Sequence, residues 1–499
     1  MKRMIILVTL LFAFLLIGCN ERTPQITSTP VSDQPQTSVS AVPSKPLVSA
    51  VPTEPPIINC ESASLKTGET IQLTVSNTKD VTWTSSDLYV AMVDDNGLVT
   101  GRHKGGTATI SGQANGEVYT CAIINTVNVR DITAKQVVSE MNIGTNYASA
   151  LDVIDWDFKK GYVANMNGAL SKLYTYQDKC GAIRPTTDMI RVFKEAGYDS
   201  IRLNISWSLY TDDQTFRIDD DFLDIVEEYV NTILDNGMYC IINSHYDYLN
   251  YSWVGDKWVG DWMKPEYKSY VDARFKAIWK QVAEHFASYN EQLIFEPMNE
   301  PSMNYEDYMK STGSDKDFQQ LQRDRVNEMN KIFYDTVRNS GGNNKNRILA
   351  MSPVMNDAYE LQYLDIPEDS KLIAEVHYYY NNDDGSPVTE WRSSNKENTK
   401  KIDQEFKLIK QDIDQVGIPV ILGEWGNTAA MPIEDRIDMS TYIIKQAHNL
   451  NVPAFWWECA WRESDGVNEN FPLFNRYTMK CAYPDLLKAI MECVKPSNE

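Results

Sequence analysis

Residues 293–301 read Leu293-Ile294-Phe295-Glu296-Pro297-Met298-Asn299-Glu300-Pro301, an apolar run that ends in polar residues. Residues 421–426 have a similar form and read Ile421-Leu422-Gly423-Glu424-Trp425-Gly426. Short, almost wholly apolar strands are typical of a parallel sheet that is covered on both faces. In such sheets the side chains that follow the carboxyl ends of the strands meet at one edge. We therefore expect Glu300 and Glu424 to lie at the same end of a parallel sheet.

Apolar runs of this kind recur along the C-terminal part of the chain, separated by amphipathic stretches that predict helices. Eight strand and helix units over roughly 360 residues predict an α/β fold, the (β/α)8 or TIM barrel, within residues 131–499. The alternative is a doubly wound open sheet, but no Gly-x-Gly-x-x-Gly motif follows the first strand. The predicted strands are Met141–Asn146, Ser200–Trp207, Tyr239–His245, Leu293–Met298, Ile348–Ser352, Leu372–Tyr378, Pro419–Gly423 and Pro453–Trp457.

The first residues have the features of a targeting segment. Lys2-Arg3 precedes an uncharged apolar run from Met4 to Ile17, which is short for a transmembrane helix. Gly18-Cys19 follows and resembles the end of a bacterial lipobox. The resemblance implies that residues 1–18 are a lipoprotein signal peptide and that Cys19 carries the lipid. We expect an extracellular protein anchored to the bacterial membrane through Cys19, with plain secretion as the alternative.

Two segments with different patterns follow the targeting segment. Residues 19–56 are rich in Pro, Ser, Thr and Val, so we expect a disordered linker. Residues 57–130 contain short alternating runs and turn residues, which predict a small all-β antiparallel sandwich. This segment resembles the bacterial immunoglobulin-like domain of group 2, and we expect Trp83 to fill its core. The resemblance rests on three stretches, at residues 81–86, 93–101 and 106–110.

The composition excludes some classes of partner and cofactor. The chain has 499 residues and a formal net charge of −22, and so acidic a protein repels the phosphate backbone of nucleic acids. With five histidines and no Cys-x-x-Cys motif, we expect neither a metal site nor another cofactor. We also expect a monomer. Disulfides are permitted outside the cytoplasm, and Cys60 and Cys121, which flank one small region, are the best candidate pair.

Polar and ionisable residues follow six of the predicted strands, where barrel enzymes carry their active sites. Two glutamates across a barrel mouth suit glycoside cleavage, because one protonates the leaving oxygen while the other attacks or activates water. Their pKa values must differ, so that one is protonated while the other is ionised. A guanidinium favours the ionised form of a neighbouring carboxyl group, as Arg202 is placed to do for Glu424. The strand-end candidates are Arg202, His245, Asn299, Glu300, His377, Tyr379, Glu424 and Trp457.

Residues 137–494 resemble glycoside hydrolase family 5, the family of retaining cellulases and their relatives. The resemblance implies that Glu300 is the acid/base, that Glu424 is the nucleophile, and that Asn299 binds the 2-hydroxyl of the sugar being cleaved. It rests on six motifs in order and at barrel spacing. These are Ile201-Arg202-Leu203, Ile242-Asn243-Ser244-His245, Phe295-Glu296-Pro297-Met298-Asn299-Glu300-Pro301, Val376-His377-Tyr378-Tyr379, Ile421-Leu422-Gly423-Glu424-Trp425-Gly426 and Phe455-Trp456-Trp457.

The resemblance also implies roles for the residues around the glutamates. Arg202 and Tyr379 would orient Glu424, while His245 and His377 would shape the cleavage subsite and its hydrogen-bond network. Flat tryptophan rings stack on the apolar faces of sugars, so one tryptophan at the end of the last strand should be the platform of this subsite.

Trp457 is the residue that the resemblance implies for this platform. Trp456 is its competitor, because neighbouring residues point to opposite faces of a strand. Three tryptophans in the loop after the third strand are candidates for either substrate contact or packing: Trp253, Trp258 and Trp262.

These observations predict a retaining endo-β-1,4-glucanase that acts on cellulose-like β-glucan. The chain departs from many relatives at the edges of the expected cleft, for example where Tyr246 replaces a second histidine after His245. Such departures concern the glycan rather than the reaction, so xyloglucanase, mixed-linkage β-glucanase and β-mannanase activities stay open. The alternative from another class is a non-catalytic glycan-binding surface lipoprotein.

Overall fold

The computed structural model describes residues 54–152, 186–212, 214–245, 247, 252–254, 257–259, 265–302, 317–382, 388–459 and 471–495. The predicted signal peptide, Cys19 and almost all of the predicted linker lie outside these residues. Within the described ranges, no helix has both the length and the apolar character needed to cross a membrane.

The N-terminal described residues form the predicted sandwich of two small sheets, with strand orders β1-β7-β6-β3 and β2-β5-β4. Strand β1 pairs with β7 in parallel, so the sandwich is not wholly antiparallel as predicted. Trp83 packs against the buried core, and glycine makes room for its ring, because a Cβ on Gly112 would lie 2.7 Å from a ring atom. The strands are β1 (Ser62–Lys66), β2 (Thr70–Gln72), β3 (Thr82–Ser85), β4 (Ala91–Val93), β5 (Leu98–Gly101), β6 (Gly106–Ala114) and β7 (Glu117–Thr126).

The predicted disulfide between Cys60 and Cys121 is not formed, and both residues are free thiols. Burial, together with a smaller effect of the neighbouring Cys60, raises the pKa of the Cys121 thiol to about 12. Because the thiolate is the species that enters disulfide chemistry, a thiol with so high a pKa reacts slowly. The prediction found two neighbouring cysteines of the sandwich, but it was wrong about the bond.

Eight parallel strands close into a barrel in the order β10-β13-β14-β15-β16-β17-β8-β9. This closed ring confirms the predicted TIM barrel and excludes the open sheet. Each of the eight predicted apolar runs overlaps one barrel strand. The strands are β8 (Ile143–Leu151), β9 (Ser200–Ile205), β10 (Tyr239–Ile242), β13 (Leu293–Phe295), β14 (Leu349–Met351), β15 (Leu372–Tyr378), β16 (Val420–Trp425) and β17 (Ala454–Trp456).

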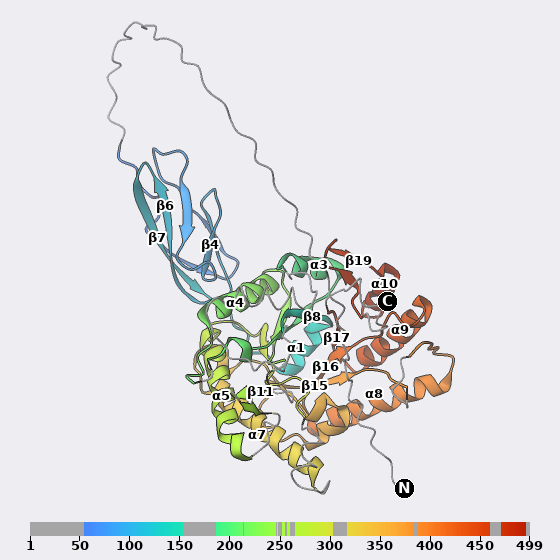
Figure 1. Cartoon of the computed structure of the whole chain (residues 1–499). Helices are drawn as coiled ribbons and strands as arrows, with labels where there is room; N and C mark the ends of the chain where they lie inside the picture. The colour runs from blue at the N-terminus through green and yellow to red at the C-terminus, as the bar shows by residue number, and fades with distance from the viewer. Residues whose placement is uncertain are drawn as a thin grey trace, which may run out of the picture. The chain divides into compact units, whose positions relative to one another are not determined.

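Helices surround the barrel strands (Figure 1). Their ends carry the expected signals: α4 begins after Asp219, whose carboxylate accepts from the Asp221 N–H, and α8 ends just before Gly417, whose φ is +79°. The helices are α1 (Ala134–Met141), α3 (Asp188–Ala196), α4 (Asp220–Asp235), α5 (Pro265–His285), α7 (Phe318–Arg338), α8 (Lys396–Val416), α9 (Ile433–Asn449) and α10 (Pro484–Glu492).

Alternation along the strands sorts the buried apolar residues into two cores. The larger core lies between the barrel and its surrounding helices. The smaller core joins the buried face of α1, which includes Val137 and Met141, to strand residues such as Ile294 and Ile421. Helix α1 therefore closes the amino-terminal end of the barrel, which leaves the carboxyl ends of the strands for polar residues.

A bulge in β16 directs Glu424 into the barrel. Along the pairing with β15, Val376 is opposite Leu422 but His377 is opposite Glu424, so Gly423 is an extra residue. A bulge of this kind re-aims the following side chain, and here it turns Glu424 toward the barrel axis. Glycine is required at position 423, because a Cβ there would lie 1.8 Å from the Glu375 Oε1.

Candidate active site

Arg202, on β9, lies at the centre of the polar cluster and is 0% exposed. Its guanidinium donates two hydrogen bonds to Glu296, at 2.6 and 2.7 Å, and one to the Glu424 Oε1 at 2.7 Å. The side-chain oxygens of Asn146 and Asn299 accept two more, at 3.0 and 2.8 Å. Burial lowers the pKa of Arg202, but the surrounding carboxylates outweigh burial and hold it well above its ordinary value. This residue is therefore a permanent positive charge beneath the site.

Both oxygens of Glu424 are held by hydrogen bonds. Arg202 donates to Oε1, and the Tyr379 hydroxyl donates to Oε2 at 3.0 Å. Burial raises the pKa of Glu424 above its ordinary value; the charges of His377 and Arg202 oppose this shift, and Glu300 adds to it. The two donors fix the orientation of a carboxylate that is only 4% exposed.

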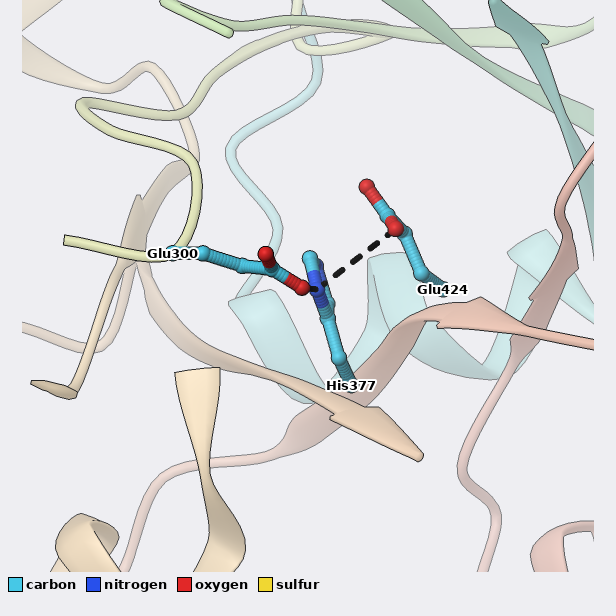
Figure 2. A group of neighbouring side chains, drawn as sticks. All are labelled: Glu300, His377 and Glu424. Carbon is cyan, nitrogen blue, oxygen red and sulfur yellow. Dashed lines mark hydrogen bonds and ion pairs between the residues drawn. The ribbon is translucent and has the colours of Figure 1, made fainter. Parts of the chain in front are cut away.

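His377 lies between the two glutamates (Figure 2). Its Nδ1 is 2.8 Å from the Glu300 Oε1 and 3.7 Å from the Glu424 Oε2, while its Nε2 is 2.9 Å from the Glu375 Oε1. Burial lowers the pKa of His377, but Glu424 and Glu375 outweigh burial and raise it to about 10. The ring is therefore an imidazolium that donates a hydrogen bond from each nitrogen.

One donor atom from each of Glu300, His377 and Glu424 lies within 4.8 Å of the others. Among the described residues, this is the only group of His, Cys, Asp and Glu side chains compact enough to hold a metal ion. A histidine must be neutral to bind a metal, whereas the pKa of His377 is raised to about 10. A metal ion here would have to displace the proton that the neighbouring carboxylates hold on His377.

His245 and Trp457 form the wall of the site at the ends of β10 and β17. Their rings stack at a centroid distance of 5.6 Å and an angle of 14°. Burial lowers the pKa of His245 well below its ordinary value, and nearby positive charges act in the same direction, so this ring is neutral. Trp456 instead is 1% exposed and packs edge to face on Trp425, in the outer core. Of the two competing tryptophans, Trp457 is the one in the site.

The structure brings all eight predicted residues to one end of the barrel. The other tryptophan candidates are not all described. Trp253 and Trp258 are opposite each other in a hairpin of β11 (Ser252–Val254) and β12 (Lys257–Val259). Their side chains lie outside the described part of the chain, as do Trp262 and Tyr246.

Four buried residues that contact Arg202 or the glutamates were not among the predicted site residues: Asn146, Glu296, Glu375 and Asn356. Burial raises the pKa of Glu296 to about 7. Burial also raises that of Glu375, but the charges of Arg202 and His377 outweigh it and lower the pKa below its ordinary value. The sequence did contain a signal for both glutamates, since each interrupts an apolar strand where an ionisable residue needs a partner.

A barrel whose carboxyl-terminal rim holds two carboxylates, oriented by an arginine, a tyrosine and a histidine, defines a glycoside hydrolase. The family model described as Cellulase (glycosyl hydrolase family 5) matches residues 159–463, more than half of the chain. The chain therefore belongs to glycosyl hydrolase family 5. The model for the bacterial Ig-like domain (group 2) matches residues 51–119.

Relatives and solved structures agree with this assignment. Endoglucanase 1 of Ruminococcus albus is 31% identical over 71% of this chain and 80% of its own length. Endoglucanase A of the same species is 31% identical over 74% of this chain and 94% of its own length. A GH5-4 broad-specificity endoglucanase from Ruminococcus champanellensis with bound cellotriose superposes with a TM-score of 0.61, at 30% identity over 73% of this chain and 99% of that one. A lichenase from Caldicellulosiruptor sp. F32, in complex with cellotetraose, has a TM-score of 0.61 at 27% identity, over 74% of this chain and 98% of that one.

Loss of the Tyr379 hydroxyl should lower the rate and raise the pKa of Glu424. Because a hydrogen bond to a charged group contributes about 1.5–3 kcal/mol, we expect Tyr379→Phe to lower kcat by roughly tenfold to a hundredfold. The hydrogen bond favours the ionised carboxylate, so its loss raises the pKa of Glu424 and moves the acidic limb of the kcat/KM profile to higher pH. Full pH–rate profiles of both proteins measure this shift.

Tyr378→Phe is the matched control, because the Tyr378 ring packs toward Phe406 in the outer core. Equal pH profiles for the two variants would show that the Tyr379 hydroxyl does not orient Glu424.

Proposed function

We propose that the protein is a retaining endo-β-1,4-glucanase, with Glu300 as the acid/base and Glu424 as the nucleophile. The separation of the two carboxylates carries the proposal, since an oxygen of one lies within 4.8 Å of an oxygen of the other. Retaining glycosidases place their carboxyl groups about 5–5.5 Å apart, whereas inverting enzymes leave about 6.5–9.5 Å for a water molecule. The spacing favours direct attack by Glu424 on the sugar.

In the first step Glu424 attacks the anomeric carbon while Glu300 protonates the departing glycosidic oxygen. Arg202 and Tyr379 hold one oxygen of Glu424 each, so the carboxylate needs no reorientation before it attacks. Burial excludes water from this carboxylate, which strengthens its interaction with the positive charge that develops on the sugar.

In the second step Glu300 removes a proton from a water molecule, which displaces Glu424 from the glycosyl intermediate. His377 donates to the Glu300 Oε1 and thereby fixes the side chain that exchanges the proton. Arg202 donates to the Asn299 Oδ1, so the Asn299 NH₂ group is directed away from Arg202 and serves as the donor for the 2-hydroxyl of the sugar. Such a bond strengthens as the transition state forms.

For the substrate we propose a β-1,4-linked glucan that stacks on Trp457. The likeness to endoglucanases, including one solved with cellotriose, supports this choice. The likeness to a lichenase supports mixed-linkage β-glucan as a second substrate. Xyloglucan and β-mannan are the remaining candidates within the same chemistry.

Initial rates of reducing-end release on carboxymethylcellulose, lichenan, xyloglucan and galactomannan test the proposal. We expect hydrolysis of the first two, with a fall in viscosity that precedes most of the reducing-end release, because an endo-acting enzyme cuts within the chain. Glu424→Gln should abolish hydrolysis on every substrate, whereas Glu434→Gln, at an exposed position in the first turn of α9, should not change it.

Hydrolysis of galactomannan alone would contradict the proposed substrate. Undiminished activity of Glu424→Gln would contradict the mechanism. Glycan binding without any release of reducing ends would favour the non-catalytic glycan-binding lipoprotein instead.

We also propose that the enzyme is extracellular and held at the bacterial membrane by a lipid on Cys19, which the preceding apolar run and Gly18 support. When the full chain is produced in a bacterium, we expect it to incorporate labelled palmitate and to enter the detergent phase of a Triton X-114 extract. Cys19→Ser should do neither. A wild-type protein that takes up no label and stays in the aqueous phase would contradict the anchor.

A further inference from the structure

Glu375 is a fully buried carboxylate that the proposed mechanism does not use, and it lies beneath both catalytic glutamates. Its Oε1 is 3.2 Å from the Arg202 Nε and 2.9 Å from the His377 Nε2, and its Oε2 accepts a 2.6 Å hydrogen bond from the Asn356 Nδ2. Two hydrogen-bond donors and one ion-pair partner, from three different segments, therefore converge on two oxygens. Gly423 leaves the space that this carboxylate occupies.

Each of these three partners contacts a catalytic glutamate directly. Arg202 donates to the Glu424 Oε1 at 2.7 Å. His377 donates to the Glu300 Oε1 at 2.8 Å. The Asn356 Oδ1 accepts a 2.7 Å hydrogen bond from the backbone N–H of Glu300. Glu375 is thus one residue away from the nucleophile and, by two separate routes, from the acid/base.

The hydrogen bond between Asn356 and the Glu300 N–H joins two short segments of strained backbone. Glu300, Met355 and Asn356 have φ values of +43°, +56° and +49°, in the region that favours glycine. Such backbone conformations are strained and persist only where surrounding contacts hold them. The negative charge of Glu375 orients the Asn356 amide, because it attracts the NH₂ group and leaves the oxygen for the Glu300 N–H.

We propose that Glu375 is a positioning residue that fixes Glu300 through His377 and Asn356 and fixes Glu424 through Arg202. The inference rests on the proposed roles of Glu300 and Glu424. It adds that one residue, Glu375, holds both side chains in position. A glutamine at position 375 has the same shape but only one acceptor oxygen and no charge, so its NH₂ group must face one of these three partners. The acid/base and the nucleophile should then lose their alignment together.

Two substrates with different leaving groups distinguish a loss of alignment of Glu300 from a loss of alignment of Glu424. Cleavage of cellotetraose needs a proton from Glu300, whereas dinitrophenyl cellobioside has a leaving group that departs without one. Asn356→Ala removes the contact with the Glu300 N–H but leaves Arg202 and His377 on Glu375. We expect it to lower kcat/KM on cellotetraose by about tenfold to a hundredfold and to change kcat/KM on the dinitrophenyl substrate by less than about threefold. We expect Glu375→Gln to lower both by about tenfold to a hundredfold.

Glu458→Gln is the matched control, because Glu458 is equally buried but accepts from the backbone N–H groups of Leu473 and Phe474. This variant should lose stability without a change in the rate on either substrate. All rates refer to folded protein, measured by circular dichroism.

Rates within about twofold of wild type for Glu375→Gln on both substrates would overturn the proposal. If Glu375→Gln does not fold, an Asn356→Ala variant that loses equally on both substrates, or on neither, would overturn it. Glu424→Gln distinguishes failure of the positioning role from failure of the proposed function. If Glu424→Gln is inactive and Glu375→Gln has wild-type rates, only the positioning role is contradicted. If Glu424→Gln is active, the proposed function itself is contradicted.

Discussion

A guanidinium buried inside a barrel needs partners for its charge, and Arg202 has them in Glu296, Glu375 and Glu424. Removal of one partner from such a group costs about 3–5 kcal/mol, because a charge is left without compensation in a medium of low dielectric. The same contacts that keep Arg202 inside the barrel therefore hold Glu424, the proposed nucleophile, in place. Stability and catalytic geometry share one set of hydrogen bonds.

The rest of the fold makes that polar cluster possible. Helix α1 fills the amino-terminal end of the barrel with apolar side chains, so the charged residues are confined to the carboxyl-terminal end. The bulge at Gly423 then adds Glu424 to the cluster from a strand whose plain alternation would point it outward. His377 joins the cluster to Glu300, which keeps a partly exposed side chain at the rim.

The sequence was sufficient for the barrel, because eight apolar runs with helical stretches between them match few other architectures. It was also sufficient to gather Arg202, Asn299 and the two glutamates at one rim, because position at a strand end is a property of the sequence. The bulge at Gly423 could not be predicted, since it depends on the register of β16 against β15. The role of Asn356 could not be predicted for a similar reason, because its contact is with the Glu300 N–H, 56 residues earlier in the chain. The choice between Trp456 and Trp457 required the direction of each side chain.

The central claim is that Glu424 forms a covalent bond to the sugar, and a trapped intermediate tests it most directly. In a 2-deoxy-2-fluoro cellobiosyl fluoride the fluorine at C2 slows both steps, while the fluoride leaving group keeps the first step fast, so a retaining enzyme accumulates the glycosyl adduct. Peptide mapping by mass spectrometry should find one adduct, on Glu424. An adduct on Glu300, or no adduct while the products of polymer cleavage carry the inverted anomeric configuration, would contradict the account.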